Sequence, residues 1–137
     1  MRLFDTTFVV DLVNGQPAAV RVAETVDEEG SLAAISVVTV HEYLFGIHYM
    51  YSREGGDVLR EKLASAGNDL DRFEAIPLSR EVVETSAGIH AELARLGKQI
   101  GINDVYIAAT GIRYGLTVVT RNKSHFDRVA KLKVEGY

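Results

Sequence analysis

Short runs of apolar residues in this chain alternate with longer segments in which apolar residues recur every three or four positions. A short apolar run bounded by turn residues is typical of a strand buried on both faces, whereas the longer spacing is typical of an amphipathic helix. The runs predict strands at residues 3–4, 32–38, 75–78 and 116–119, with a further edge strand at residues 132–134.

The periodic segments predict helices, and glycine or proline marks most of their boundaries. Thr6 and Thr7 are candidate caps for a brief helical turn that Asn14–Gly15 closes. Further helices are expected at residues 17–30, 40–51, 58–73 (interrupted around Gly67), 82–96 and, after a turn at 101–103, up to Gly115. The last helix is rich in small residues, so its Gly111 and Gly115 indicate close helix packing or a helix stop.

Strands that alternate with helices imply parallel pairing through right-handed crossover connections. We therefore predict an α/β fold, a three-layer α/β/α sandwich around a central four- to five-stranded parallel sheet. The sequence has no internal repeat, linker or low-complexity tract, so residues 1–137 are expected to form a single domain.

The composition excludes several kinds of chemistry and indicates where in the cell the protein is expected. The absence of cysteine excludes disulfides, thiolate zinc sites and cysteine nucleophiles. No apolar run approaches the roughly 18 residues that span a bilayer. Asp5 and Asp11 interrupt the opening apolar stretch, which argues against a signal peptide. We expect a cytoplasmic protein without membrane association.

The net charge of −4 is unlike that of a protein that binds nucleic acid through a broad basic surface. Either nucleic acid is not the ligand, or a metal ion supplies positive charge at the point of contact.

Polar side chains follow several of the predicted strands, at the sheet edge where open parallel sheets bind ligands. Asp5 follows the first strand and Glu42 lies in the first turn of the helix after the second. Asp104 opens the helix that leads into the fourth strand, and Arg121–Asn122 follows that strand directly. Three acids and an asparagine should converge there, and oxygen ligands suit a hard cation such as Mg²⁺ or Mn²⁺.

Each acid also has a structural interpretation. Thr39 and Glu42 have the spacing of a helix capping box, and Asp104 in a first helical turn would favour the helix dipole. Asp5 is harder to explain structurally, because a carboxylate between apolar runs is costly to bury without a partner or a metal. The remaining early acids are expected to be solvated surface charges: Asp11, Asp27, Glu28 and Glu29.

Other residues and motifs contribute less. The chain has no P-loop, no G-x-G-x-x-G and no G-x-S-x-G elbow, and His41–Glu42 lacks the second histidine of a zinc-protease helix. Arg121 and Lys123 flank Asn122 and are well placed to contact phosphate. Asp127 is a nearby acid that lies off the pattern.

Four segments together resemble a known family. They are Leu-Phe-Asp5-Thr6, Val-Val-Thr-Val-His-Glu42 with Gly46 after it, Ile-Asn-Asp104-Val-Tyr-Ile-Ala-Ala, and Leu-Thr-Val-Val-Thr120-Arg121-Asn122. In order, spacing and chain length they resemble PIN-domain ribonucleases, in particular the VapC-type toxins of bacterial and archaeal toxin–antitoxin pairs. No single segment is specific to this family, but the four segments together, in this order and spacing, are fairly specific to it. They cover essentially the whole sequence.

The resemblance implies a site built from five residues. Asp5, Glu42 and Asp104 would form the acidic cluster that holds metal, with Thr120 as a supporting hydroxyl and Asn122 at the fourth polar position. Many PIN domains carry Asp at the fourth position, whereas VapC-like members often carry Asn. Only three carboxylates remain, so one tightly held metal is easier to defend than two.

The resemblance also implies an activity and partners. Bound Mg²⁺ or Mn²⁺ would activate water and neutralise the scissile phosphate of RNA. In-line attack should then leave a 5′-phosphate and a 3′-hydroxyl. Metal at the contact point would also reconcile an acidic protein with an anionic substrate. Such toxins dimerise and are inhibited by a small antitoxin protein that occludes the site, and the apolar stripe of Leu44, Ile47 and Tyr51 favours a homodimer.

Two other functions remain open. A catalytically silent PIN-like interaction module would keep the fold but fail to bind metal. A receiver-type phospho-acceptor domain would need an acceptor Asp after the third strand, but that strand ends in Pro77-Leu78-Ser79.

Overall fold

A five-stranded parallel sheet forms the centre of the molecule, in the order β3-β2-β1-β4-β5. The computed structural model describes residues 1–137. The strands are β1 (Arg2–Phe4), β2 (Ala33–Ser36), β3 (Glu74–Ile76), β4 (Thr117–Val119) and β5 (Lys133–Glu135). Both the parallel pairing and the fifth, edge strand were predicted from the sequence.

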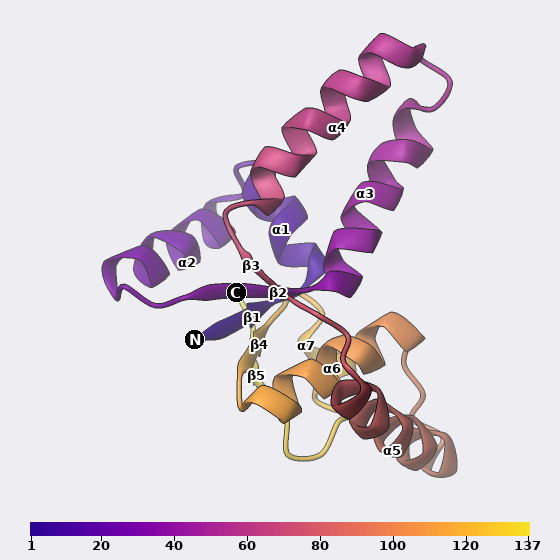
Figure 1. Cartoon of the computed structure of the whole chain (residues 1–137). Coiled ribbons are helices and arrows are strands. Elements are labelled where there is room, and N and C mark those ends of the chain that lie inside the picture. The colour runs from indigo at the N-terminus through magenta and orange to yellow at the C-terminus, as the bar shows by residue number, and fades with distance from the viewer.

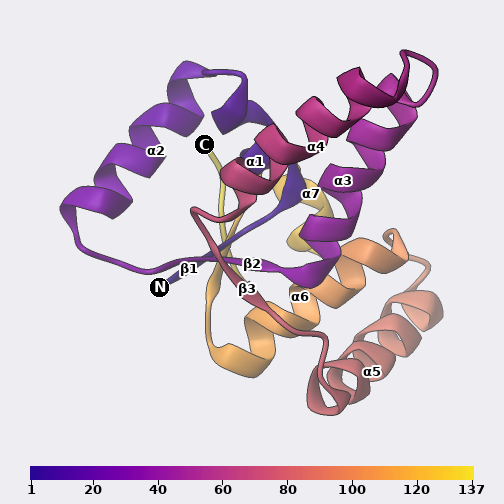
Figure 2. The ribbon, with the colours of Figure 1, turned by 45° about the horizontal axis from the view of Figure 1, so that its top comes forward.

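Seven helices connect the strands and cover both faces of the sheet (Figure 1). They are α1 (Thr6–Val13), α2 (Pro17–Glu28), α3 (Val37–Tyr51), α4 (Gly56–Leu70), α5 (Arg80–Leu96), α6 (Ile102–Tyr114) and α7 (Lys123–Phe126). In Figures 1 and 2, α1 to α4 lie on one side of the sheet and α5 and α6 on the other, while α3 and α4 form a projecting hairpin. The three-layer α/β/α sandwich is therefore confirmed.

Two hydrophobic cores, one on each side of the sheet, follow from the alternation of side chains along the strands. Leu3 and Val118 point into the core beneath α5 and α6, whereas their neighbours Phe4 and Val119 point into the core beneath α1 to α4. All four are almost completely buried. Such continuous apolar strands are expected in a parallel sheet covered on both faces.

The small residues of α6 allow that helix to pack closely on the sheet. A side chain at Gly111 would meet Leu132 and Val118 at 3.0 Å, tighter than most real contacts. Gly115 ends the helix with a φ of +65°, a conformation that strongly favours glycine. Both interpretations of this glycine pair are therefore correct. None of the helices has the length and apolar character needed to cross a membrane.

Several sequence-based expectations about where helices and strands begin, end or break were wrong, and local hydrogen bonding explains two of them. The cap of α1 is Asp5, not Thr6 or Thr7, because the Asp5 carboxylate accepts the Phe8 backbone N–H at 3.1 Å. The second strand ends at Ser36, whose hydroxyl accepts the Val38 N–H and starts α3 early. The third error was the interruption around Gly67, since α4 continues through it.

The strand order creates a topological switch point between β1 and β4. The chain steps from β1 outward to β2 and β3, then returns to pair β4 with the other side of β1. In open α/β sheets, ligands bind outside the carboxyl ends of the strands at such a point. The residues that follow Phe4 and Val119, which are Asp5 and Thr120, therefore mark the expected site.

Candidate active site

Asp5 sits at the switch point and is only 3% exposed. One carboxylate oxygen, Oδ1, accepts the Phe8 N–H at 3.1 Å and the Thr7 hydroxyl at 2.7 Å. The other, Oδ2, accepts the Thr120 hydroxyl at 2.7 Å. A carboxylate has about four lone-pair positions, so Oδ2 keeps one for a further ligand while the group remains fixed in place.

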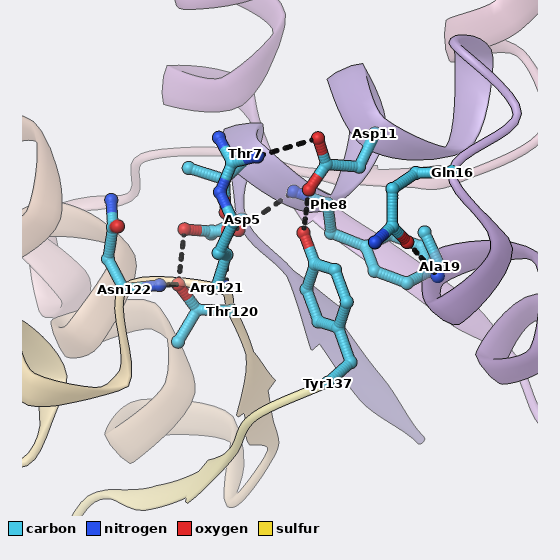
Figure 3. A network of polar contacts seen from close by, with 10 residues as sticks. All are labelled: Asp5, Thr7, Phe8, Asp11, Gln16, Ala19, Thr120, Arg121, Asn122 and Tyr137. Atoms are coloured by element: carbon cyan, nitrogen blue, oxygen red, sulfur yellow. Dashed lines mark hydrogen bonds and ion pairs between the residues drawn. The ribbon is translucent and has the colours of Figure 1, made fainter.

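Thr120 links Asp5 to the segment after β4. It is fully buried, and its hydroxyl donates to Asp5 and accepts the backbone N–H of Asn122 at 2.9 Å (Figure 3). The Asn122 side chain does not cap α7 and, as Figure 3 shows, points away from this network. Thr120 thus supports Asp5, and the Asn122 amide is free to meet a ligand.

Glu42 lies in the second turn of α3, not in the first as expected, because the helix begins at Val37. Its carboxylate accepts the Thr6 hydroxyl at 2.6 Å. Ser36 caps the helix, so the capping-box interpretation of Thr39 and Glu42 is wrong. The buried Thr39 hydroxyl oxygen instead lies 3.4 Å from the Thr6 hydroxyl oxygen.

Asp104 lies in the first turn of α6, where a negative charge is favourable. The N-cap of the helix is Gly101, and no side chain caps this helix end through a hydrogen bond. The Asp104 carboxylate is therefore not used as a cap and remains available to bind a ligand. Its basic partner is His125, close to α6 on α7, whose Nδ1 lies 3.5 Å from Asp104 Oδ2.

His125 was not recognised from the sequence. It lies on the segment after β4, three residues past Asn122, and the rule that found Asn122 could have pointed to it.

One solvent-open cavity of about 350 Å³ brings these side chains together. Its lining residues are Asp5, Thr6, Thr7, Val10, Glu42, Asp104, Arg121, Asn122 and His125. The lining contains one apolar residue. Asp5, Glu42, Asp104 and Asn122 therefore share the predicted edge, although no three acidic or histidine side chains are already gathered at metal-binding distance. A cation held by all three acids would draw their side chains inward.

Burial and mutual repulsion act on two of the carboxylates. Burial raises the pKa of Asp5 above 3.8, and the nearby Asp104 charge adds to the rise against the hydrogen bonds from Thr120, Thr7 and Phe8. Burial also raises the pKa of Asp104, with a further contribution from Glu42 and an opposing one from His125. Like charges held close together in partial burial are a common property of functional sites.

Asp11 is not the solvated surface charge that we expected. It is 6% exposed, and its two oxygens accept Arg121 Nη1 at 2.9 Å and the Tyr137 hydroxyl at 2.7 Å. Both partners are more than 100 residues away in the sequence, so only the tertiary structure reveals the pairing. Lys123 is likewise paired, with Asp127 at 2.7 Å.

A second hollow lies beside the site, between α1, α3 and α4. It measures about 380 Å³, and its lining includes Val10, Val13, Tyr43, Ile47 and Met50. Glu42 and Val10 line both hollows, so the second one opens next to the acidic site.

The sheet order, the two helical layers and the acids at the switch point define an α/β domain with a candidate hydrolytic site, and comparison with known proteins agrees. The family model of the PIN domain matches residues 2–132. The chain belongs to the PIN domain family.

Within this family the chain is similar to VapC ribonucleases and to the toxin FitB. The chain is 28% identical to the tRNA(fMet)-specific endonuclease VapC of Shigella flexneri over 135 residues, 98% of this chain and 96% of that protein. It is 32% identical to Toxin FitB of Neisseria gonorrhoeae over 130 residues, covering 92% and 91%. The DNA-bound VapBC structure from Salmonella typhimurium aligns at a TM-score of 0.83 and 26% identity, covering 99% and 98%. The resemblance seen in the sequence is therefore confirmed.

Proposed function

We propose that this protein is a metal-dependent endoribonuclease and the toxin of a toxin–antitoxin pair. The observation that carries the proposal is that Asp5, Glu42 and Asp104 line one cavity at the switch point of a VapC-type PIN fold. Relatives named as ribonucleases cover nearly the whole chain, which favours an active enzyme over a silent interaction module.

The donor set fits Mg²⁺ or Mn²⁺. Asp5 through Oδ2, Asp104 and Glu42 would hold the ion, since carboxylate oxygens are the ligands that hard cations prefer. When bound, the ion lowers the pKa of a water ligand and neutralises charge on the scissile phosphate. Thr120 keeps Asp5 oriented through its 2.7 Å hydrogen bond, and the Asn122 amide can orient water or phosphate.

RNA is the proposed substrate. The chain carries a net charge of −4, so a polyanion gains little from the overall surface and must be attracted locally. A divalent ion among three carboxylates gives such a local attraction, and these acids line a cavity that is open to solvent.

Two protein partners complete the proposal. The structural neighbours include VapBC and FitAcB complexes, which supports a small antitoxin as partner of this chain. The hollow between α1, α3 and α4, whose lining mixes apolar side chains with the charged Glu42, Lys62 and Asp69, is a suitable contact surface next to the site. A homodimer is also proposed. Leu44 and Ile47, two residues of the stripe first considered for it, pack against the core instead, whereas Phe45, Tyr49 and Met50 are 60%, 79% and 65% exposed.

The test is cleavage of RNA by the purified protein, freed of any bound antitoxin. We expect cleavage with Mg²⁺ or Mn²⁺, products with a 5′-phosphate, and none in excess EDTA. Asp104→Asn is the matched inactive control. Undiminished cleavage in EDTA would eliminate the metal mechanism, and absence of cleavage under all metal conditions would favour the silent module.

A further inference from the structure

The buried Asp11 carboxylate joins the C-terminus of the chain to the rim of the active site. Its Oδ1 accepts Arg121 Nη1 at 2.9 Å, and its Oδ2 accepts the Tyr137 hydroxyl at 2.7 Å (Figure 3). Its side chain is 9% exposed, so solvent contributes little to its stabilisation. Three segments that are far apart in the sequence therefore meet at one carboxylate: α1, the residues after β4, and the last residue.

Arg121 is the part of this network that reaches the cavity. It lines the same hollow as Asp5, Glu42 and Asp104, and its side chain is 58% exposed. Its backbone N–H donates to the Thr7 hydroxyl at 3.3 Å, which holds the start of the side chain close to Asp5. A guanidinium has five N–H donors, and only Nη1 is engaged by another residue.

Tyr137 fixes Asp11 from the other side. Its ring packs edge-on against Phe8, with centroids 5.3 Å apart, and Phe8 is a core residue of α1. Burial and the hydrogen bond to Asp11 raise the pKa of Tyr137, so its hydroxyl remains a proton donor across the physiological range. The donor that orients Asp11 is thus itself held by core packing.

We propose that Arg121 contacts a phosphate group of the RNA substrate, and that Asp11 and Tyr137 are positioning residues that hold its guanidinium at the rim of the cavity. This inference rests on the proposed ribonuclease function. Arginine binds phosphate through two parallel N–H donors in a fixed plane. A guanidinium that is already oriented by Asp11 loses less freedom when it binds.

Charge supports this assignment. The cavity lining carries three carboxylates, and Arg121 is its one permanent cation. The other basic residue of this loop, Lys123, does not line the cavity and is paired with Asp127 at 2.7 Å. Arg121 is therefore the one permanent positive charge that the protein offers to an anionic substrate inside the cavity.

A purely structural role makes different predictions. If the Arg121–Asp11 pair only ties the loop to α1, its loss would lower the melting temperature without changing how RNA binding responds to salt. A phosphate contact instead releases counterions from the RNA. For single-stranded RNA, each phosphate contact contributes about 0.7 to the magnitude of the slope of the logarithm of the binding constant against the logarithm of the salt concentration. The salt slope therefore separates the two roles.

The experiment compares wild type with Arg121→Gln and Arg121→Lys. Arg80→Gln is the matched control, because Arg80 is another exposed arginine in an ion pair, with Glu84, and lies outside the cavity. Binding of a fluorescent single-stranded RNA is measured by anisotropy in Ca²⁺, which takes the same kind of oxygen ligands, and KM and kcat are measured in Mg²⁺.

We expect Arg121→Gln to weaken binding and raise KM about tenfold or more, as for loss of a hydrogen bond to a charged group. We also expect it to lower the salt slope by about 0.7. Arg121→Lys should restore the slope and only part of the affinity, since it keeps the charge but not the planar fork. An unchanged slope and KM in Arg121→Gln, matching Arg80→Gln, would overturn the proposal.

Tyr137 is tested through a double-mutant cycle. We expect Tyr137→Phe to raise KM about threefold in the wild-type background and to have no effect on KM in the Arg121→Gln background, because it acts through Arg121. Equal effects in both backgrounds would remove its positioning role. Wild type that binds RNA with the expected slopes but never cleaves it would refute the ribonuclease function and leave the Arg121 contact standing.

Discussion

Replacing Asp5 separates the requirement for its charge from its role as a helix cap. In Asp5→Asn, the retained oxygen can still accept the Phe8 N–H and the Thr7 hydroxyl, now 3.1 and 2.7 Å from Oδ1. The second oxygen becomes an NH₂ group and no longer accepts the Thr120 hydroxyl. Asp5→Ala removes all three acceptor contacts at once.

The two variants should differ in stability by a measurable amount. In Asp5→Asn, the new NH₂ group can donate to the Thr120 oxygen, which otherwise accepts only the Asn122 N–H. Relief of the burial and repulsion that raise the Asp5 pKa offsets the lost acceptor, so stability should change by less than about 1 kcal/mol. Asp5→Ala loses the cap, about 1 kcal/mol, and leaves the buried Thr120 hydroxyl without its acceptor, about 1–3 kcal/mol. For a domain of this size 1 kcal/mol corresponds to roughly 4 °C in Tm.

The assay is thermal unfolding with and without Mn²⁺, together with RNA cleavage. Asp5→Asn should melt within about 4 °C of wild type, or above it, show no Mn²⁺-dependent rise in Tm, and fail to cleave RNA. Asp5→Ala should melt roughly 8–16 °C lower. The reasoning is refuted if Asp5→Asn is as unstable as Asp5→Ala, or if it keeps both the Mn²⁺ response and cleavage.

Three further predictions concern the rest of the site and the surface. Asp104→Asn should abolish cleavage and be more stable than wild type at pH 7. Because the pKa of Asp104 is raised in the folded protein, this difference in stability should shrink as the pH falls toward 3.8. Denaturation at several pH values measures it. Calorimetry with Mn²⁺ should show that Asn122→Ala retains metal binding and that Asn122→Asp binds the metal more tightly. Asn122→Ala should reduce cleavage less than Asp5→Asn does. Complete loss of metal binding in Asn122→Ala would make Asn122 a direct ligand. Light scattering should give twice the 15.0 kDa chain mass for wild type and a monomer for Phe45→Ser/Tyr49→Ser; a wild-type monomer at micromolar concentration contradicts the dimer.

The sheet and the position of the acids could be predicted because both depend on features that are local in sequence. Leu3–Phe4 and Val118–Val119 are apolar on consecutive positions, as strands buried on both faces must be. Parallel strands then bring their carboxyl ends to one edge, so Asp5 and the residues after β4 were expected on the same edge, and the pairing of β1 with β4 makes them neighbours. The order of the strands, which creates the switch point, was not predicted from the sequence and is known only from the structure.

Features that depend on competition between side chains could not be predicted in the same way. Ser36, Thr39 and Thr6 are all good caps in isolation, and the choice of Ser36 and Asp5 depends on where the pleated strands end. Asp11 looks like a surface acid until Arg121 and Tyr137 are brought to it from the other end of the chain. The periodicity of apolar residues along the sequence cannot predict contacts between side chains that are so far apart in the chain.

The raised pKa of Asp5 is itself evidence on why a carboxylate is there. Asparagine caps helices about as well as aspartate, and a neutral amide would avoid both the burial of a charge and the repulsion from Asp104. As a cap alone, Asp5 is therefore a worse solution than an asparagine would be at the same position. We therefore propose that the charge of Asp5 serves to bind a cation, and a cation bound between Asp5 and Asp104 would remove the repulsion and raise the stability of the folded protein. A rise in Tm with Mn²⁺ is the measurable consequence of this argument.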